Sequence, residues 1–280
     1  MGRSSANAYD YQGMRAICFV NEKGGVGKTT SCVNLAASLA QRGYEVLCVD
    51  MDPQSNATLG VGVDPDDVEH PAHMLLLDRD FPMQRAIIPT EIDRLDLLPA
   101  NASLAACNHA LVAAVGRELR LRNKILDYTK DTFTKKYDFL LADCSPTLDL
   151  LTVNVLMAST HLIVPVQPRF LALQGMELLG QTVSLLYDQL DPALSLLGVV
   201  VTFFENRAAM DRAVLDLLRE KMDREYGDYI FHTVLRKSVA VSEGEVDSVP
   251  IVVRDPASPP AQAYESLTDE VLGRLGVTVH

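Results

Sequence analysis

The feature that most constrains the fold of this chain is a glycine-rich segment at residues 23–30, KGGVGKTT, which joins an apolar run to a helical pattern. The apolar residues 16–20 predict a buried strand before it, and residues 29–41 place apolar side chains three and four apart, as an amphipathic helix does. Glycines at such a junction let backbone N–H groups face inward, and the helix N-terminus adds partial positive charge. The segment therefore predicts a cradle for phosphate groups.

Two side chains of this cradle have specific expected tasks. Lys28 is placed to reach the β- and γ-phosphates of a nucleotide, and the Thr29 hydroxyl is placed to ligate the Mg²⁺ ion that bridges those phosphates. The general pattern, GxxxxGK followed by Ser or Thr, has a glycine five residues before Gly27, where this chain has Glu22, and Lys23 comes directly after it. The residues expected to bind the nucleotide are Gly24, Gly25, Val26, Gly27, Lys28, Thr29 and Thr30.

With a lysine at position 23, the segment resembles the deviant Walker A box of the ParA/MinD group of P-loop ATPases. The resemblance implies ATP and Mg²⁺ as cofactors and a homodimer that forms when ATP is bound. It also implies that Lys23 is catalytic together with Lys28, because Lys23 would cross the dimer interface and touch the nucleotide bound by the partner. The alternative for Lys23 is an ordinary solvated lysine in a loop.

A second box follows the next apolar run. It reads VDMDPQSN over residues 49–56 and resembles the family's VDxDPQxN. Residues two apart in a strand share a face, so Asp50 and Asp52 can both point toward the phosphates. The resemblance implies that Asp52 orients or activates the attacking water and that Asp50 lies near the magnesium shell, through water. The alternative is an Asp–Pro turn, which accounts for Asp52 alone.

A third box is the apolar run that ends at Asp143, which resembles a Walker B strand and implies magnesium binding through water. It continues as DCSP where the family often has DCPP. Further resemblances lie at residues 165–168, 171–175, 242–244 and 254–256, so the likeness covers about residues 15 to 275.

The wider pattern predicts an α/β fold with a doubly wound, mostly parallel sheet flanked by helices. Residues 1–14 are polar and small and are expected to form a disordered leader, followed by one ATPase domain over residues 15–280. Predicted strands are residues 16–20, 45–51, 95–98, 139–142, 161–166 and 196–203. Predicted helices are residues 29–41, 148–157, 173–190, 207–224 and 260–275.

Composition limits the range of functions. The formal net charge of −12 argues against a protein whose whole surface is basic and binds nucleic acid. Any contact with DNA must therefore use a local basic patch. The five cysteines form no CxxC pair and are expected to be reduced thiols of a cytosolic protein. Cys107 and Cys144 lack the setting of iron–sulfur ligands, which disfavours a nitrogenase-reductase-like carrier. No stretch has the length of a membrane span, so no integral membrane association is expected.

The resemblance implies slow, partner-stimulated ATP hydrolysis in a cytoplasmic protein that positions a cargo, with an activator encoded elsewhere. Non-specific DNA binding on the nucleoid would use basic residues late in the chain, for which Arg236, Lys237 and Arg254 are the candidates. Relatives often carry arginine where this chain has Ala240, Ala257 and Pro259. The alternative is therefore a positioning ATPase that has lost DNA binding and works through a protein partner or a membrane surface, although the acidic tail disfavours anionic lipid.

Overall fold

The computed structural model describes residues 11–168, 194–205, 212–213, 215–216, 220 and 229–277. Within these residues, eight strands form one sheet in the order β3-β4-β2-β5-β1-β6-β7-β8. Only β3 runs antiparallel to its neighbour, so the sheet is mostly parallel, as predicted. The strands are β1 (Arg15–Phe19), β2 (Val46–Met51), β3 (Ile88–Pro89), β4 (Leu95–Leu98), β5 (Phe139–Cys144), β6 (His161–Val166), β7 (Ser195–Phe204) and β8 (Ile230–Arg236).

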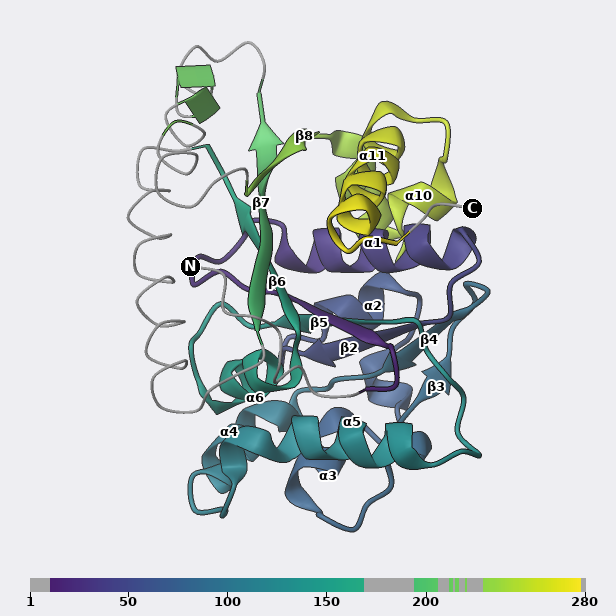
Figure 1. Ribbon diagram of the computed structural model, residues 1–280, viewed down its shortest axis with the longest axis vertical. Helices are drawn as coiled ribbons and strands as arrows, with labels where there is room; N and C mark the ends of the chain where they lie inside the picture. The colour runs from purple at the N-terminus through teal and green to yellow at the C-terminus, as the bar shows by residue number, and fades with distance from the viewer. Residues whose placement is uncertain are drawn as a thin grey trace.

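Helices cover both faces of the sheet, with α1 and α11 above it and α3, α4, α5 and α6 below it in Figure 1. Side chains alternate along the strands, so Ile17 and Phe19 of β1 belong to the core under α1, whereas Ala16 and Cys18 belong to the core over α6. The described helices are α1 (Lys28–Gln41), α2 (Asn56–Gly60), α3 (Ala72–Leu77), α4 (Ser103–Leu111), α5 (Arg120–Lys130), α6 (Leu150–Ala158), α9 (Val239–Val246), α10 (Ile251–Arg254) and α11 (Pro259–Arg274), with 3₁₀ turns η1 (Pro65–Asp67), η2 (Met83–Arg85) and η3 (Arg117–Leu119).

The six predicted strands are all present, and the predictions for β4 and β6 match to the residue. The sequence did not predict the two edge strands, β3 and β8, or the short helices between β2 and β5. Strand β3 has only two residues, and β8 carries polar side chains at His232 and Thr233, which weakens its apolar signal. The helix predicted at 173–190 lies outside the described residues, as does most of the one predicted at 207–224.

Residues 11–14 pack against the domain, although the sequence predicts that they belong to a disordered leader over residues 1–14. Tyr11 and Met14 are buried, with 2% and 8% of their surface exposed, and the Tyr11 hydroxyl donates a hydrogen bond of 2.9 Å to the carbonyl of Ala158 at the end of α6. One large aromatic side chain in a polar segment gives too weak a signal to predict this packing. Residues 1–10 lie outside the described part.

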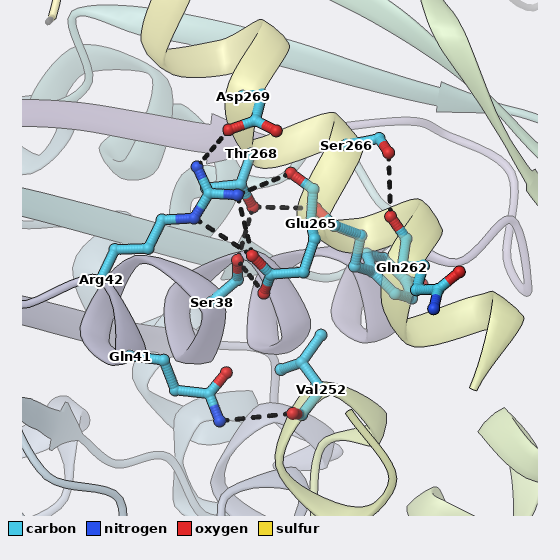
Figure 2. Close-up of polar contacts among 10 residues, drawn as sticks. Ser38, Gln41, Arg42, Val252, Gln262, Glu265, Ser266, Thr268 and Asp269 are labelled. Carbon is cyan, nitrogen blue, oxygen red and sulfur yellow. Dashed lines mark hydrogen bonds and ion pairs between the residues drawn. The ribbon is translucent and has the colours of Figure 1, made fainter. Parts of the chain in front are cut away.

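The C-terminal helix α11 is fixed across α1 by a polar network (Figure 2). The Arg42 guanidinium pairs with Glu265 at 2.8 Å and with Asp269 at 2.5 Å, and the Ser38 hydroxyl donates to Glu265 at 2.6 Å. Thr268 donates to the Ser38 hydroxyl at 2.8 Å, deeper between the helices. Because α1 begins at the glycine-rich loop, this contact holds the helix that carries the predicted phosphate cradle.

Candidate nucleotide-binding site

The predicted site residues converge where three adjacent strands end. Strand β5 lies between β2 and β1, and its Asp143 is in register with Asp50 on one side and Phe19 on the other. The glycine-rich loop leaves β1 directly after Phe19. The loop and both carboxylates therefore meet at the carboxyl edge of a parallel sheet, the usual ligand position in open α/β folds.

The backbone of the loop requires glycine at two positions. Gly25 has φ 67° and Gly27 has φ 84°, values in the left-handed region. At Gly27 a side chain would also be crowded, because a Cβ there would lie 3.2 Å from Cε2 of Phe203 and would push that ring away by a few tenths of an ångström. Helix α1 starts at Lys28, and no side chain caps its first turn. The first N–H groups of the helix are thus available to an anion.

Side-chain hydrogen bonds hold the loop against strands β6 and β7 and against the residue that follows β6. Asn21 Nδ2 donates to the carbonyl of Pro165 at 2.7 Å, and Gln167 Nε2 donates to the carbonyl of Gly25 at 2.6 Å. The Thr202 hydroxyl donates to the carbonyl of Val26 at 2.8 Å. Sequence reasoning assigned none of these residues a role. Gln167 stood in a segment with a family resemblance, but Asn21 and Thr202 gave no signal in the sequence.

The two lysines of the loop differ in exposure. Lys28 is buried, with 6% of its surface exposed, and its Nζ lies 3.3 Å from the carbonyl oxygen of Lys23. The backbone N–H of Lys23 is fixed by Asn21 Oδ1 at 2.9 Å, while the Lys23 side chain is exposed. Lys28 therefore faces the inside of the loop, and Lys23 is accessible to another molecule.

Thr29 and Asp143 form the pair that suits a magnesium ion. The Thr29 hydroxyl donates to Asp143 Oδ2 at 2.6 Å, and the other oxygen, Oδ1, is buried without a hydrogen-bond partner. Burial raises the pKa of Asp143 well above its ordinary value, and the Asp50 carboxylate raises it further, while the Thr29 hydrogen bond lowers it. A buried carboxylate oxygen with no donor, beside a threonine hydroxyl, fits a hard divalent cation.

Asp50 has a different environment, because both of its oxygens accept hydrogen bonds from the protein. Oδ2 accepts from the backbone N–H and the hydroxyl of Thr58 at 2.8 and 2.7 Å, and Oδ1 accepts from the backbone N–H of Asp52 at 3.0 Å. Burial raises the pKa of Asp50 to about 6. Asp50 thus connects β2 to α2 and stands beside Asp143, without the open oxygen that Asp143 has.

Asp52 follows the end of β2 and keeps 7% of its surface exposed. Its Oδ1 accepts a hydrogen bond from the backbone N–H of Gln54 at 2.9 Å, which fixes the carboxylate close enough to Asp143 for its charge to raise the pKa of Asp143. The turn chemistry considered for this residue is therefore present, and it orients the side chain as well as the backbone.

Comparisons with known proteins agree with this geometry. A family model described as an AAA domain matches residues 14–196. The sporulation initiation inhibitor protein Soj of Bacillus subtilis is 37% identical over 257 residues, which cover 92% of this chain and 98% of Soj. The chain belongs to the ParA/MinD family of P-loop ATPases. The chromosome partitioning protein ParA of Myxococcus xanthus is 35% identical and covers 93% of this chain and 88% of its own length.

A solved structure of a ParA/MinD family member carries the same fold. The septum site-determining protein MinD of Pyrococcus horikoshii, complexed with Mg-ADP, superimposes with a TM-score of 0.72 and is 27% identical. The alignment covers 92% of this chain and 96% of MinD. The doubly wound α/β fold predicted from the sequence is thereby confirmed.

The basic residues that the ParA/MinD resemblance nominates for DNA contact are partly paired with carboxylates. Arg254 pairs with Asp247 at 2.8 Å and with Glu243 at 3.3 Å, and Lys237 lies 3.6 Å from Glu205. Arg236 is exposed at the end of β8. Exposed pairs of this kind are worth little in water and exchange readily for other partners.

The five cysteines are free and buried, and the described residues contain no group of three or more His, Cys, Asp or Glu side chains that could hold a metal ion. Among the described helices, none combines the length and apolar composition needed to cross a membrane.

Proposed function

We propose that this ParA/MinD family ATPase is an ATP-dependent dimerising switch that positions a cargo. The observation that carries the proposal is the Thr29–Asp143 pair at 2.6 Å, with a buried Asp143 oxygen left without a partner beside a glycine loop. ParA of Myxococcus xanthus is named a chromosome partitioning protein, and MinD of Pyrococcus horikoshii was solved with Mg-ADP. The MinD structure supports an adenine nucleotide with Mg²⁺ as the ligand here, and both names support positioning as the task.

The site suits phosphoryl transfer by positioning and charge. The backbone N–H groups of the loop and Lys28 would hold the phosphates, and Thr29 and Asp143 would hold Mg²⁺, which neutralises charge that develops on the transferred group. Asp52, which follows the end of β2, would orient the attacking water. Little covalent work is needed from the protein, so a site that is completed only in the dimer hydrolyses ATP slowly and responds to an activator.

Lys23 is proposed to complete the site of the partner subunit. Its backbone is fixed while its side chain is exposed, which suits a residue that reaches across an interface. We expect Lys23→Ala to bind ATP normally but to remain monomeric with ATP in analytical ultracentrifugation, because the bridging positive charge is lost. A Lys23→Ala protein that dimerises and hydrolyses ATP as the wild type does would contradict the trans role and leave the fold and the nucleotide site intact.

Non-specific DNA is the proposed track of the switch, and its binding is the test of the cargo-positioning function. Fluorescence anisotropy on a labelled duplex would be measured with ATP, with ADP and without nucleotide, across a salt series, using Asp52→Ala to keep ATP intact. We expect binding only with ATP and a steep loss of affinity with salt, because basic side chains displace counterions from phosphates. Arg254→Ala should reduce the slope of the logarithm of affinity against the logarithm of salt concentration by about one. The exposed control Lys130→Ala, on α5, should leave this slope unchanged.

A second candidate function is favoured by the ion pairs of Lys237 and Arg254. If these cations stay paired with Glu205 and Asp247, the protein is a positioning ATPase that works through a protein partner or a membrane surface. Absence of DNA binding in every nucleotide state would favour this candidate over the first. A cytoplasmic location is proposed in both cases, with association with the nucleoid only in the first.

A further inference from the structure

A carboxylate lies against the phosphate cradle and has no part in the proposed chemistry. The Thr30 hydroxyl donates a hydrogen bond of 2.5 Å to Oε1 of Glu245. Thr30 is in the first turn of α1, directly after Thr29, whereas Glu245 is on α9, more than two hundred residues later in the chain. The contact therefore joins the loop to the C-terminal part of the molecule.

The neighbouring acidic residues of α9 have other partners. Glu243 and Asp247 both pair with Arg254, so their charges are compensated. Glu245 is exposed, and no Lys or Arg of the described residues forms an ion pair with it. Its compensation comes from the Thr30 hydroxyl and from the N-terminus of α1, where partial positive charge stabilises an anion.

The same helix end is the place where the phosphates of a nucleotide bind. Ser31 makes the first regular helical hydrogen bond, to Gly27 at 3.0 Å, so the N–H groups before it are available to phosphate oxygens. Two anions at one helix end repel each other, and the Thr30 hydroxyl has only one proton to donate.

We infer that Glu245 is an internal competitor of the nucleotide: its carboxylate accepts the hydrogen bond of the Thr30 hydroxyl and must give it up when phosphates bind. Glu245 thereby lowers nucleotide affinity, and nucleotide binding breaks the contact between the loop and α9. The adjacent carboxylates of α9 hold Arg254, so the break occurs beside a candidate DNA contact. The inference rests on the proposed nucleotide binding and extends it to the regulation of the same site.

Binding of Mg-ADP, measured by isothermal titration calorimetry, tests the inference with Glu245→Gln. The amide keeps the shape of the side chain and removes the charge. We expect ADP to bind Glu245→Gln roughly five-fold more tightly than it binds the wild type at low salt, because one charge repulsion at an exposed site is removed. The difference should shrink in about 1 M salt, where the screening length falls to about 3 Å.

Glu243→Gln is the matched control, because it removes the same charge from the same helix two residues away, from a side chain that faces Arg254. Equal tightening in both variants would mean a general charge effect and would overturn the inference. Unchanged affinity in Glu245→Gln would overturn the inference, because the Thr30–Glu245 contact would then be purely structural. Weaker affinity would also overturn it, because Glu245 would then help to bind the nucleotide. Failure of the wild type to bind Mg-ADP would instead contradict the proposed function.

Discussion

Replacement of Asp52 by alanine is expected to reduce ATP hydrolysis by about 10²- to 10⁴-fold, the range that a positioned general base contributes. ATP binding should persist, because the phosphates are held by the loop and Lys28 rather than by this carboxylate. The measurement is phosphate release with the activator or at saturating ATP, together with the Kd for a non-hydrolysable ATP analogue.

The fold should tolerate this change. Asp52 gives up one hydrogen bond, to the backbone N–H of Gln54, which is worth on the order of 1 kcal/mol. Asp52→Asn keeps that bond and should be equally inactive, which separates chemistry from turn geometry. Asp67→Ala removes an exposed aspartate from η1 and should hydrolyse ATP normally. Normal hydrolysis by both Asp52 variants would assign the activation of water to another group.

Replacement of Lys28 by alanine is expected to weaken ATP binding by roughly 100-fold, because a charge-assisted contact to phosphate in a buried setting is worth up to about 3 kcal/mol. Lys28 is 6% exposed, so water replaces its charge poorly. The Kd for Mg-ATP, measured by calorimetry or by a fluorescent analogue, checks this expectation, with the melting temperature as the control for folding.

Lys23→Ala serves as the matched comparison for Lys28→Ala, since both remove one lysine from the same loop. The exposed Lys23 variant should bind ATP with nearly the affinity of the wild type, but it should fail to dimerise and therefore to hydrolyse ATP normally. A Lys28→Ala protein that binds ATP normally would show that backbone N–H groups alone hold the phosphates, and the role assigned to Lys28 would be wrong.

The fold could be predicted from the sequence where the signal is local. Apolar runs of four to six residues gave β4 and β6 to the residue, and the three-to-four spacing of apolar side chains gave α1 and α11. The two-residue strand β3 and strand β8, whose apolar run is interrupted by His232 and Thr233, could not be found in this way, because their pairing with neighbouring strands is not a local signal. For the same reason, the burial of Tyr11 against α6 was missed.

The sequence by itself determined which groups the protein can use: the glycine loop, its two lysines, and the carboxylates at the ends of β2 and β5. Those identities follow from chemistry that only a few residue types can provide at that spacing. Only the tertiary structure decided how these groups are held. Hydrogen bonds of Asn21, Gln167 and Thr202 fix the loop. Thr58 donates to the Asp50 carboxylate, and Thr30 donates to Glu245. These contacts join residues that the order of strands in the sheet and the packing of helices bring together, and periodicity along the chain carries no information about them.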